Sequence, residues 1–116
     1  MLNHCTFIGN LVRDPELRAT QNGTSVCNFT IAAEDGWGDK KHTEFVNCVA
    51  WSKNAENLNS YQHKGNRLYV QGRMHTRTWD NKEGVKQYKT EVVADVIKFL
   101  DKKEDNRVPN DDNQPF

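Results

Sequence analysis

Apolar and polar residues alternate over several short stretches of the chain, and turn-forming residues separate each stretch from the next. A two-residue period places successive side chains on opposite faces of a β-strand. The pattern predicts strands at residues 6–12, 26–33, 44–51, 67–79 and 85–99. The segments between them contain the glycine, asparagine, aspartate and proline residues that favour turns, so the chain is expected to form an all-β domain.

One segment has a helical period instead. Between residues 52 and 64 the apolar side chains recur at every third position, at Ala55, Leu58 and Tyr61. Ser52 or Asn54 is expected to cap the start of this helix, and Gly65 follows its end. Five strands with one helix between the third and the fourth is the order of an OB-fold, a five-stranded Greek-key barrel.

The end of the chain differs from the rest in composition. Apolar residues almost disappear after Phe99, and residues 104–116 hold four acids against one base, a charge of −3. Because the whole chain of 116 residues is neutral, residues 1–103 carry +3. We expect one domain over residues 1–101, followed over residues 102–116 by a short disordered linker and an acidic tip.

The tip has the features of a docking peptide. Two acids, Asp111 and Asp112, precede Pro115 and the final Phe116. An aromatic ring beside a carboxylate suits an apolar pocket rimmed by Arg or Lys, and the acids would steer it there. The tip is therefore suited to bind partner proteins, and the alternative is an ordinary disordered end of the chain.

The strand at 67–79 carries the strongest functional signal. Residues 64–89 hold seven bases against two acids, a local charge of +5. One face of the strand is apolar and is expected to join the core: Leu68, Val70, Gly72 and Met74. The other face alternates rings with cations: Tyr69, Gln71, Arg73, His75, Arg77 and Trp79. A single strand of nucleic acid needs both, for its bases and its phosphates. The alternative is a merely solvated face, with Tyr69 in a contact between subunits.

Other aromatic residues divide between surface and core. Trp37 stands between two glycines in the polar loop 35–41, so an exposed stacking role is expected. Trp79, at the foot of a charged hairpin, is also expected to be exposed. Trp51 shares a strand face with Phe45, and a tryptophan within a barrel strand is most often a core residue.

No arrangement typical of catalysis is present, so neither an enzyme nor a cofactor or metal site is expected. The three cysteines form no CxxC pair and are expected to be buried, reduced thiols, and the four histidines lack zinc spacing. No apolar run is long enough to span a membrane, so a cytoplasmic protein is expected. On these residues alone, a second class of binding protein stays open, an OB-fold that binds protein partners or RNA.

Several short motifs occur in a recognisable order along the whole chain. They are residues 8–11 (Ile-Gly-Asn-Leu), 14–18, 55–57, 64–65, 69–72 (Tyr-Val-Gln-Gly), 76–79, 90–93 and the Asp-Asp-x-x-Pro-Phe ending. With them the chain resembles the single-stranded DNA-binding protein family of bacteria and phages. The resemblance implies a homotetramer of OB-folds around which single-stranded DNA wraps, and which protects that DNA in replication, recombination and repair. It also implies a bacterial cytoplasm or nucleoid, or a phage-infected cell, as the location.

The resemblance assigns roles to individual residues. Stacking aromatic side chains of the family correspond to Trp37, Phe45, Trp51 and Trp79. Bases that contact the DNA backbone correspond to Lys53, Lys64, Arg77 and Arg18, to which the strand pattern adds Arg73. Trp51 thereby becomes an expected DNA contact rather than a core residue. The acidic tip corresponds to the segment that recruits replication and recombination enzymes.

Three departures from the family pattern lower particular expectations. Phe45 stands where many relatives have tryptophan, which weakens stacking there. His75 and Thr78 stand where bases are frequent, which reduces the charge beside Trp79. The linker is only about ten polar residues long, and Asn113 replaces a third acid, so the sequence leaves the affinity of the tip for partners open.

Overall fold

Five β-strands close into a barrel in the computed structural model, which describes residues 1–100. They are β1 (Cys5–Leu11), β3 (Ser25–Asp35), β4 (His42–Trp51), β5 (Arg67–Asp80) and β6 (Lys86–Phe99). The order is β1-β5-β6-β4-β3, and β3 pairs with β1 to close the barrel. Among the strands of residues 1–100, only β4 and β6 pair in parallel. The predicted fold class, an OB-fold with a five-stranded Greek-key barrel, is confirmed.

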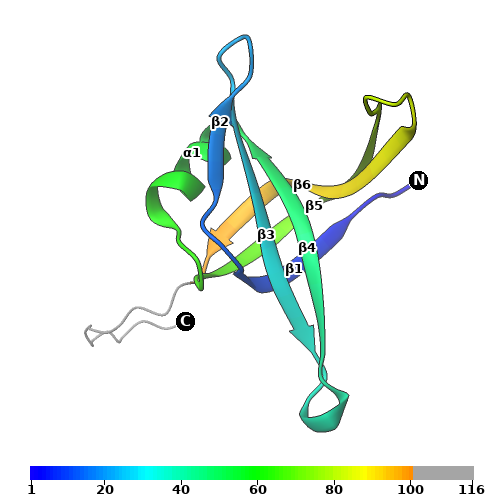
Figure 1. The fold of residues 1–116 in the computed structure, drawn as a ribbon. Helices are drawn as coiled ribbons and strands as arrows, with labels where there is room; N and C mark the ends of the chain where they lie inside the picture. Colours follow the sequence, from blue (N-terminus) through cyan, green and yellow to red (C-terminus); the bar gives the residue numbers. More distant parts are fainter. Residues whose placement is uncertain (101–116) are drawn as a thin grey trace.

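A sixth strand, β2 (Glu16–Ala19), was absent from the prediction. It pairs only with β3, from Glu16 opposite Asn28 to Ala19 opposite Ser25. All four of its residues are exposed, so no buried face imposes an apolar alternation on its sequence. Backbone pairing along the edge of β3 defines this strand, and Figure 1 shows it beside β3 near the helix.

The predicted helix lies between β4 and β5 as α1 (Ser52–Tyr61), and it buries Ala55 and Leu58. The predicted caps are wrong, because no side chain caps the first turn. Ser52 has a left-handed φ of 56°, and the Asn54 side chain donates to the Asp95 carbonyl instead. Within residues 1–100, no helix is long and apolar enough to cross a membrane.

The barrel interior is filled by side chains from all five barrel strands and α1. The largest of these buried side chains are Leu11, Phe29, Ile31, Leu58, Leu68, Val70 and Val92. Cys27 and Cys48 are buried free thiols, as predicted, whereas Cys5 is half-buried. Burial raises the pKa of Cys27 to about 11 and that of Cys48 to about 12, with a smaller effect from Glu16 and Glu91 respectively. Both thiols therefore stay protonated at neutral pH.

Two hairpin arms extend from the barrel in different directions (Figure 1). The β3–β4 arm ends in the short helix η1 (Gly38–Lys40), within the segment predicted as a loop. In the β5–β6 arm, β1 accompanies β5 only as far as Gly72, and beyond it β6 is the remaining partner. Met74 was predicted to face the core but is 50% exposed, because it lies beyond Gly72, the last residue of β5 that pairs with β1.

Candidate nucleic-acid interface

The register between β3 and β4 decides which side chains lie outside the barrel. Directly opposed residues of an antiparallel pair point to the same face. Trp51 is opposite Val26, and Phe45 is opposite Ala32, whereas the neighbouring Cys27 and Phe29 point into the core. Trp51 and Phe45 therefore share the outer face, and they are 44% and 67% exposed. The interpretation of Trp51 as a core residue is wrong.

The same face continues across β6 onto β5. Val49 and Val93 pair between the parallel strands β4 and β6, and Val93 is opposite Arg73 on β5. Farther along the arm, Arg77 is opposite Lys89 and Trp79 is opposite Gln87. The pairing of β6 with both strands thus joins the cation-bearing face predicted for β5 to the aromatic face of β4.

A hollow of about 410 Å³, called here the Trp51 pocket, lies where these strands meet. Its lining includes four of the predicted DNA-binding residues: Arg18, Trp51, Arg73 and Arg77. Two further lining residues, Val26 and Val49, are almost fully buried and form an apolar floor. An apolar floor with one exposed ring and three guanidinium groups around it can accept a base and its phosphate together.

Arg77 links the Trp51 pocket to Trp79. Its Nε donates to Glu91 Oε1 at 3.0 Å, and its Cζ lies 5.2 Å from the centre of the Trp79 ring. That distance is within the range of cation–π attraction. Trp79 itself is 43% exposed, so one side of the ring remains available.

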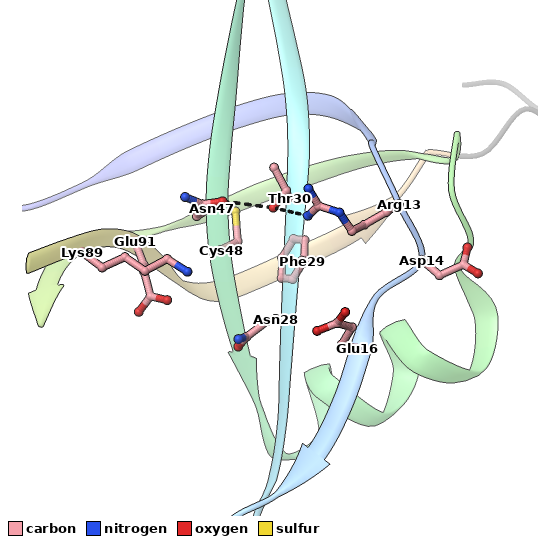
Figure 2. Close-up of a pocket in the computed structure, with 10 residues that line it drawn as sticks. All are labelled: Arg13, Asp14, Glu16, Asn28, Phe29, Thr30, Asn47, Cys48, Lys89 and Glu91. Atoms are coloured by element: carbon pink, nitrogen blue, oxygen red, sulfur yellow. Dashed lines mark hydrogen bonds between the residues drawn. The ribbon is translucent and has the colours of Figure 1, made fainter. Parts of the chain in front are cut away.

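A second hollow of about 340 Å³, called here the Thr30 pocket, adjoins the first and shares Asn28 and Glu91 with it. Figure 2 shows Arg13 reaching toward Thr30, with Asn47 beside it on β4. Arg13 Nη1 donates to Thr30 Oγ1 at 3.1 Å, and this hydroxyl donates to Asn47 Oδ1 at 3.0 Å. A guanidinium cannot accept a hydrogen bond, so Arg13 donates to the Thr30 hydroxyl, and the hydroxyl donates to the Asn47 oxygen. These two bonds fix the orientation of the Asn47 amide.

Two of the expected cations are ion-paired. Arg73 Nη1 lies 3.1 Å from Asp95 Oδ1, and Arg77 Nε lies 3.0 Å from Glu91 Oε1. Both acids come from β6, beyond residues 64–89, in which the charge of +5 was counted. The outer face is therefore less positive than that count suggested.

The similarity of the chain to known proteins agrees with this architecture. Residues 2–100 match the single-strand binding protein family. The chain belongs to this family. A single-stranded DNA-binding protein of Staphylococcus aureus (strain MRSA252) is 44% identical over 114 residues, covering 96% of this chain and 73% of the relative. One of Halalkalibacterium halodurans is also 44% identical, over 104 residues, covering 87% of this chain and 62% of the relative.

A solved structure described as "Plasmodium falciparum SSB complex with ssDNA" has the same fold. Its TM-score is 0.77 at 29% sequence identity, and the match covers 87% of this chain and 96% of that chain. Among residues 1–100 of this single-strand binding family protein, no cluster of His, Cys, Asp and Glu could hold a metal ion.

Five predicted DNA-binding residues of the family member line neither pocket: Phe45 and Trp79, described above, and Trp37, Lys53 and Lys64. Trp37, at the tip of the β3–β4 arm, is 83% exposed. Lys53 is exposed in the first turn of α1, and Lys64 lies in the turn after that helix. The Lys64 backbone nitrogen donates to Asp14 Oδ1 at 2.8 Å, which ties this turn to the segment before β2. The predicted partner-binding residues Asp111, Asp112, Pro115 and Phe116 lie outside the described residues.

Several residues of this interface were missed from the sequence: Arg13, Asn28, Thr30, Asn47 and Glu91. Strand parity could have found part of this set, because Asn28 and Thr30 alternate with Cys27, Phe29 and Ile31, which fill the core. Arg13 has no such signal, since it lies between two strands.

Proposed function

We propose that the protein binds single-stranded DNA without sequence preference along the outer face of β3, β4, β6 and β5. Bases stack on Phe45, Trp51 and Trp79, and phosphates meet Arg18 and Arg77. The observation that carries the proposal is the Trp51 pocket, in which an exposed ring, an apolar floor and guanidinium groups lie together. The names of the relatives and the solved complex of a structural neighbour support the same ligand.

The absence of sequence preference follows from the chemistry of stacking on the aromatic side chains. Every base has a π-face, so stacking tolerates all four bases. Of the remaining expected contacts, Arg73 lines the Trp51 pocket, and Trp37, Lys53 and Lys64 extend the path beyond it. Such binding protects single strands during replication, recombination and repair and requires no catalytic step.

A homotetramer is part of the proposal. From Cys5 to Gly9 the outer edge of β1 has no strand partner among residues 1–100. Ile8 is 53% exposed and lies opposite the half-buried Tyr69. An unpaired edge beside an exposed apolar side chain suits contact with another copy. Sedimentation analysis tests this: Ile8→Glu should shift the tetramer to smaller species.

The acidic tip supplies the second proposed activity. Asp111, Asp112, Pro115 and Phe116 would dock on replication and recombination enzymes while the barrel holds DNA. Because the tip carries no base, its role in recruiting partners is separable from DNA binding.

Tryptophan fluorescence tests the DNA proposal directly. Oligo-dT is expected to quench Trp37, Trp51 and Trp79 strongly, because unpaired bases reach the rings. Duplex DNA of equal length is expected to quench little, since its base faces are stacked on one another. Oligo-U is the control for an RNA-binding OB-fold. Equal quenching by single-stranded and duplex DNA would refute the proposal.

A further inference from the structure

Glu91 is the only buried acidic side chain among residues 1–100, with 6% of its surface exposed. It lies on the face where we place the DNA, and it lines both the Trp51 pocket and the Thr30 pocket. A negative charge at that position opposes a polyanion. Burying a carboxylate is also costly unless it is paired and hydrogen-bonded. Neither base stacking nor phosphate contact explains a buried carboxylate at this position, so Glu91 is expected to have another role.

The partner of Glu91 is Arg77, on the neighbouring strand. Arg77 faces Lys89 directly, and Glu91 faces His75, so the Arg77–Glu91 pair crosses the two strands diagonally. The bond uses Arg77 Nε, at 3.0 Å from Glu91 Oε1. Trp79 follows two residues later on the same face of β5. The order along the arm is thus a buried acid, a half-exposed guanidinium and an exposed ring.

The guanidinium can serve three partners at once. It has five N–H donors in a planar fork, and its π-face can lie over an aromatic ring. Glu91 engages the Nε donor, and Arg77 Cζ lies over the Trp79 ring, 5.2 Å from its centroid. Within residues 1–100, the Nη donors have no bonded acceptor. They are available to a phosphate.

We propose, on the basis of the DNA-binding function proposed above, that Glu91 is a positioning residue for stacking at Trp79. It fixes Arg77 at the Nε donor, and Arg77 in turn holds one face of the Trp79 ring. The acid also lowers the positive charge that Arg77 presents to phosphate. Stacking at Trp79 and phosphate contact at Arg77 are therefore coupled through Glu91.

A double-mutant cycle in DNA binding measures this coupling. Arg77→Ala, Trp79→Ala and the double variant are compared with wild type by anisotropy of labelled oligo-dT. In the wild-type background, the double variant should bind at least about twofold more tightly than the product of the single losses predicts. In the Glu91→Ala background, the affinity loss of the double variant should equal the product of the two single losses, because Arg77 no longer holds the ring.

Glu91→Gln separates position from charge. The glutamine oxygen still accepts from Arg77 Nε, so the coupling between Arg77 and Trp79 should persist. Removal of the charge should raise affinity at low salt and steepen the salt dependence, by about 0.7 in slope for each phosphate newly neutralised. A purely structural role for Glu91 would change stability and leave this slope unchanged.

Asp95→Asn is the matched control, because it removes an acid from the same strand pair but from a different arginine, Arg73. It should leave the coupling between Arg77 and Trp79 at the wild-type value. Circular dichroism and thermal unfolding establish that each variant is folded. If Glu91→Ala does not fold, the wild-type cycle and the Glu91→Gln slope decide the question.

Multiplicative losses in wild type, or coupling that survives Glu91→Ala, would overturn the role of Glu91. A Glu91→Gln salt slope equal to that of wild type would do the same. A wild-type protein that does not bind oligo-dT would instead refute the proposed function. The two failures are therefore distinguishable.

Discussion

Replacing Trp51 with alanine tests the proposed DNA-binding face at the Trp51 pocket. Trp51 is the last residue of β4 and stands at the edge of the Trp51 pocket, opposite Val26. Its ring is the aromatic member of the pocket lining. The substitution leaves Arg18, Arg73 and the apolar floor in place, so it removes the stacking surface without removing charge.

The expected loss can be estimated from stacking energies. Base stacking on an aromatic side chain contributes about 1–3 kcal/mol, which corresponds to a roughly 5- to 150-fold increase in Kd. Truncating a fully buried tryptophan costs about 3–5 kcal/mol of stability. Because Trp51 is 44% exposed, its loss should cost roughly half of that, about 2 kcal/mol. A domain with about 5–15 kcal/mol of stability remains folded.

Anisotropy of labelled oligo-dT measures the affinity, and thermal unfolding measures the folded fraction. Tyr61→Ala is the matched control, because this ring is 64% exposed on α1 and lines neither pocket. Its Kd should stay within about twofold of wild type. The reasoning fails if Trp51→Ala also binds within that range. It fails equally if the variant unfolds while its folded fraction binds normally.

Three further predictions address charge, the tip and the thiols. Arg77→Ala should weaken binding to all sequences alike and flatten the salt slope by at most about 0.7, as salt titrations will show. Deleting residues 111–116, of net charge −2, should leave DNA affinity unchanged or slightly higher but abolish pull-down of replication enzymes; weaker DNA binding would contradict this. Only Cys5 should react rapidly with a thiol reagent at pH 8. Because burial raises the pKa of Cys27 and Cys48 from 9.0, stability should fall as pH rises from 9.0 toward about 11.

The barrel strands were predictable because burial on one face forces a two-residue period on the sequence. The predicted strand 67–79 differs from β5 by one residue, and 85–99 differs from β6 by one. Where no face is buried, the period carries no such information. This is why β2 was missed, and why Met74 was placed in the core although its strand has already left the barrel.

The sequence could predict which side chains of one strand share a face of the interface, but not which side chains of other strands lie beside them. Parity along β5 placed Arg73, Arg77 and Trp79 on one face, and the register confirms that placement. Which residues oppose that face depends on pairing between segments far apart in sequence. The acids Glu91 and Asp95 meet these arginines through β5–β6 pairing, and charge counting along the chain misses such pairs.

The ion pairs also bear on how a neutral chain can bind a polyanion. A guanidinium that is already held by a carboxylate loses less conformational freedom when it meets a phosphate. Its charge is partly offset, so a larger share of affinity must come from rings and from the apolar floor of the Trp51 pocket. Contact with base faces is independent of sequence and less sensitive to salt than phosphate contact. In the proposed function, Arg73 and Arg77 would therefore orient the single strand, and Trp51 and Trp79 would retain it.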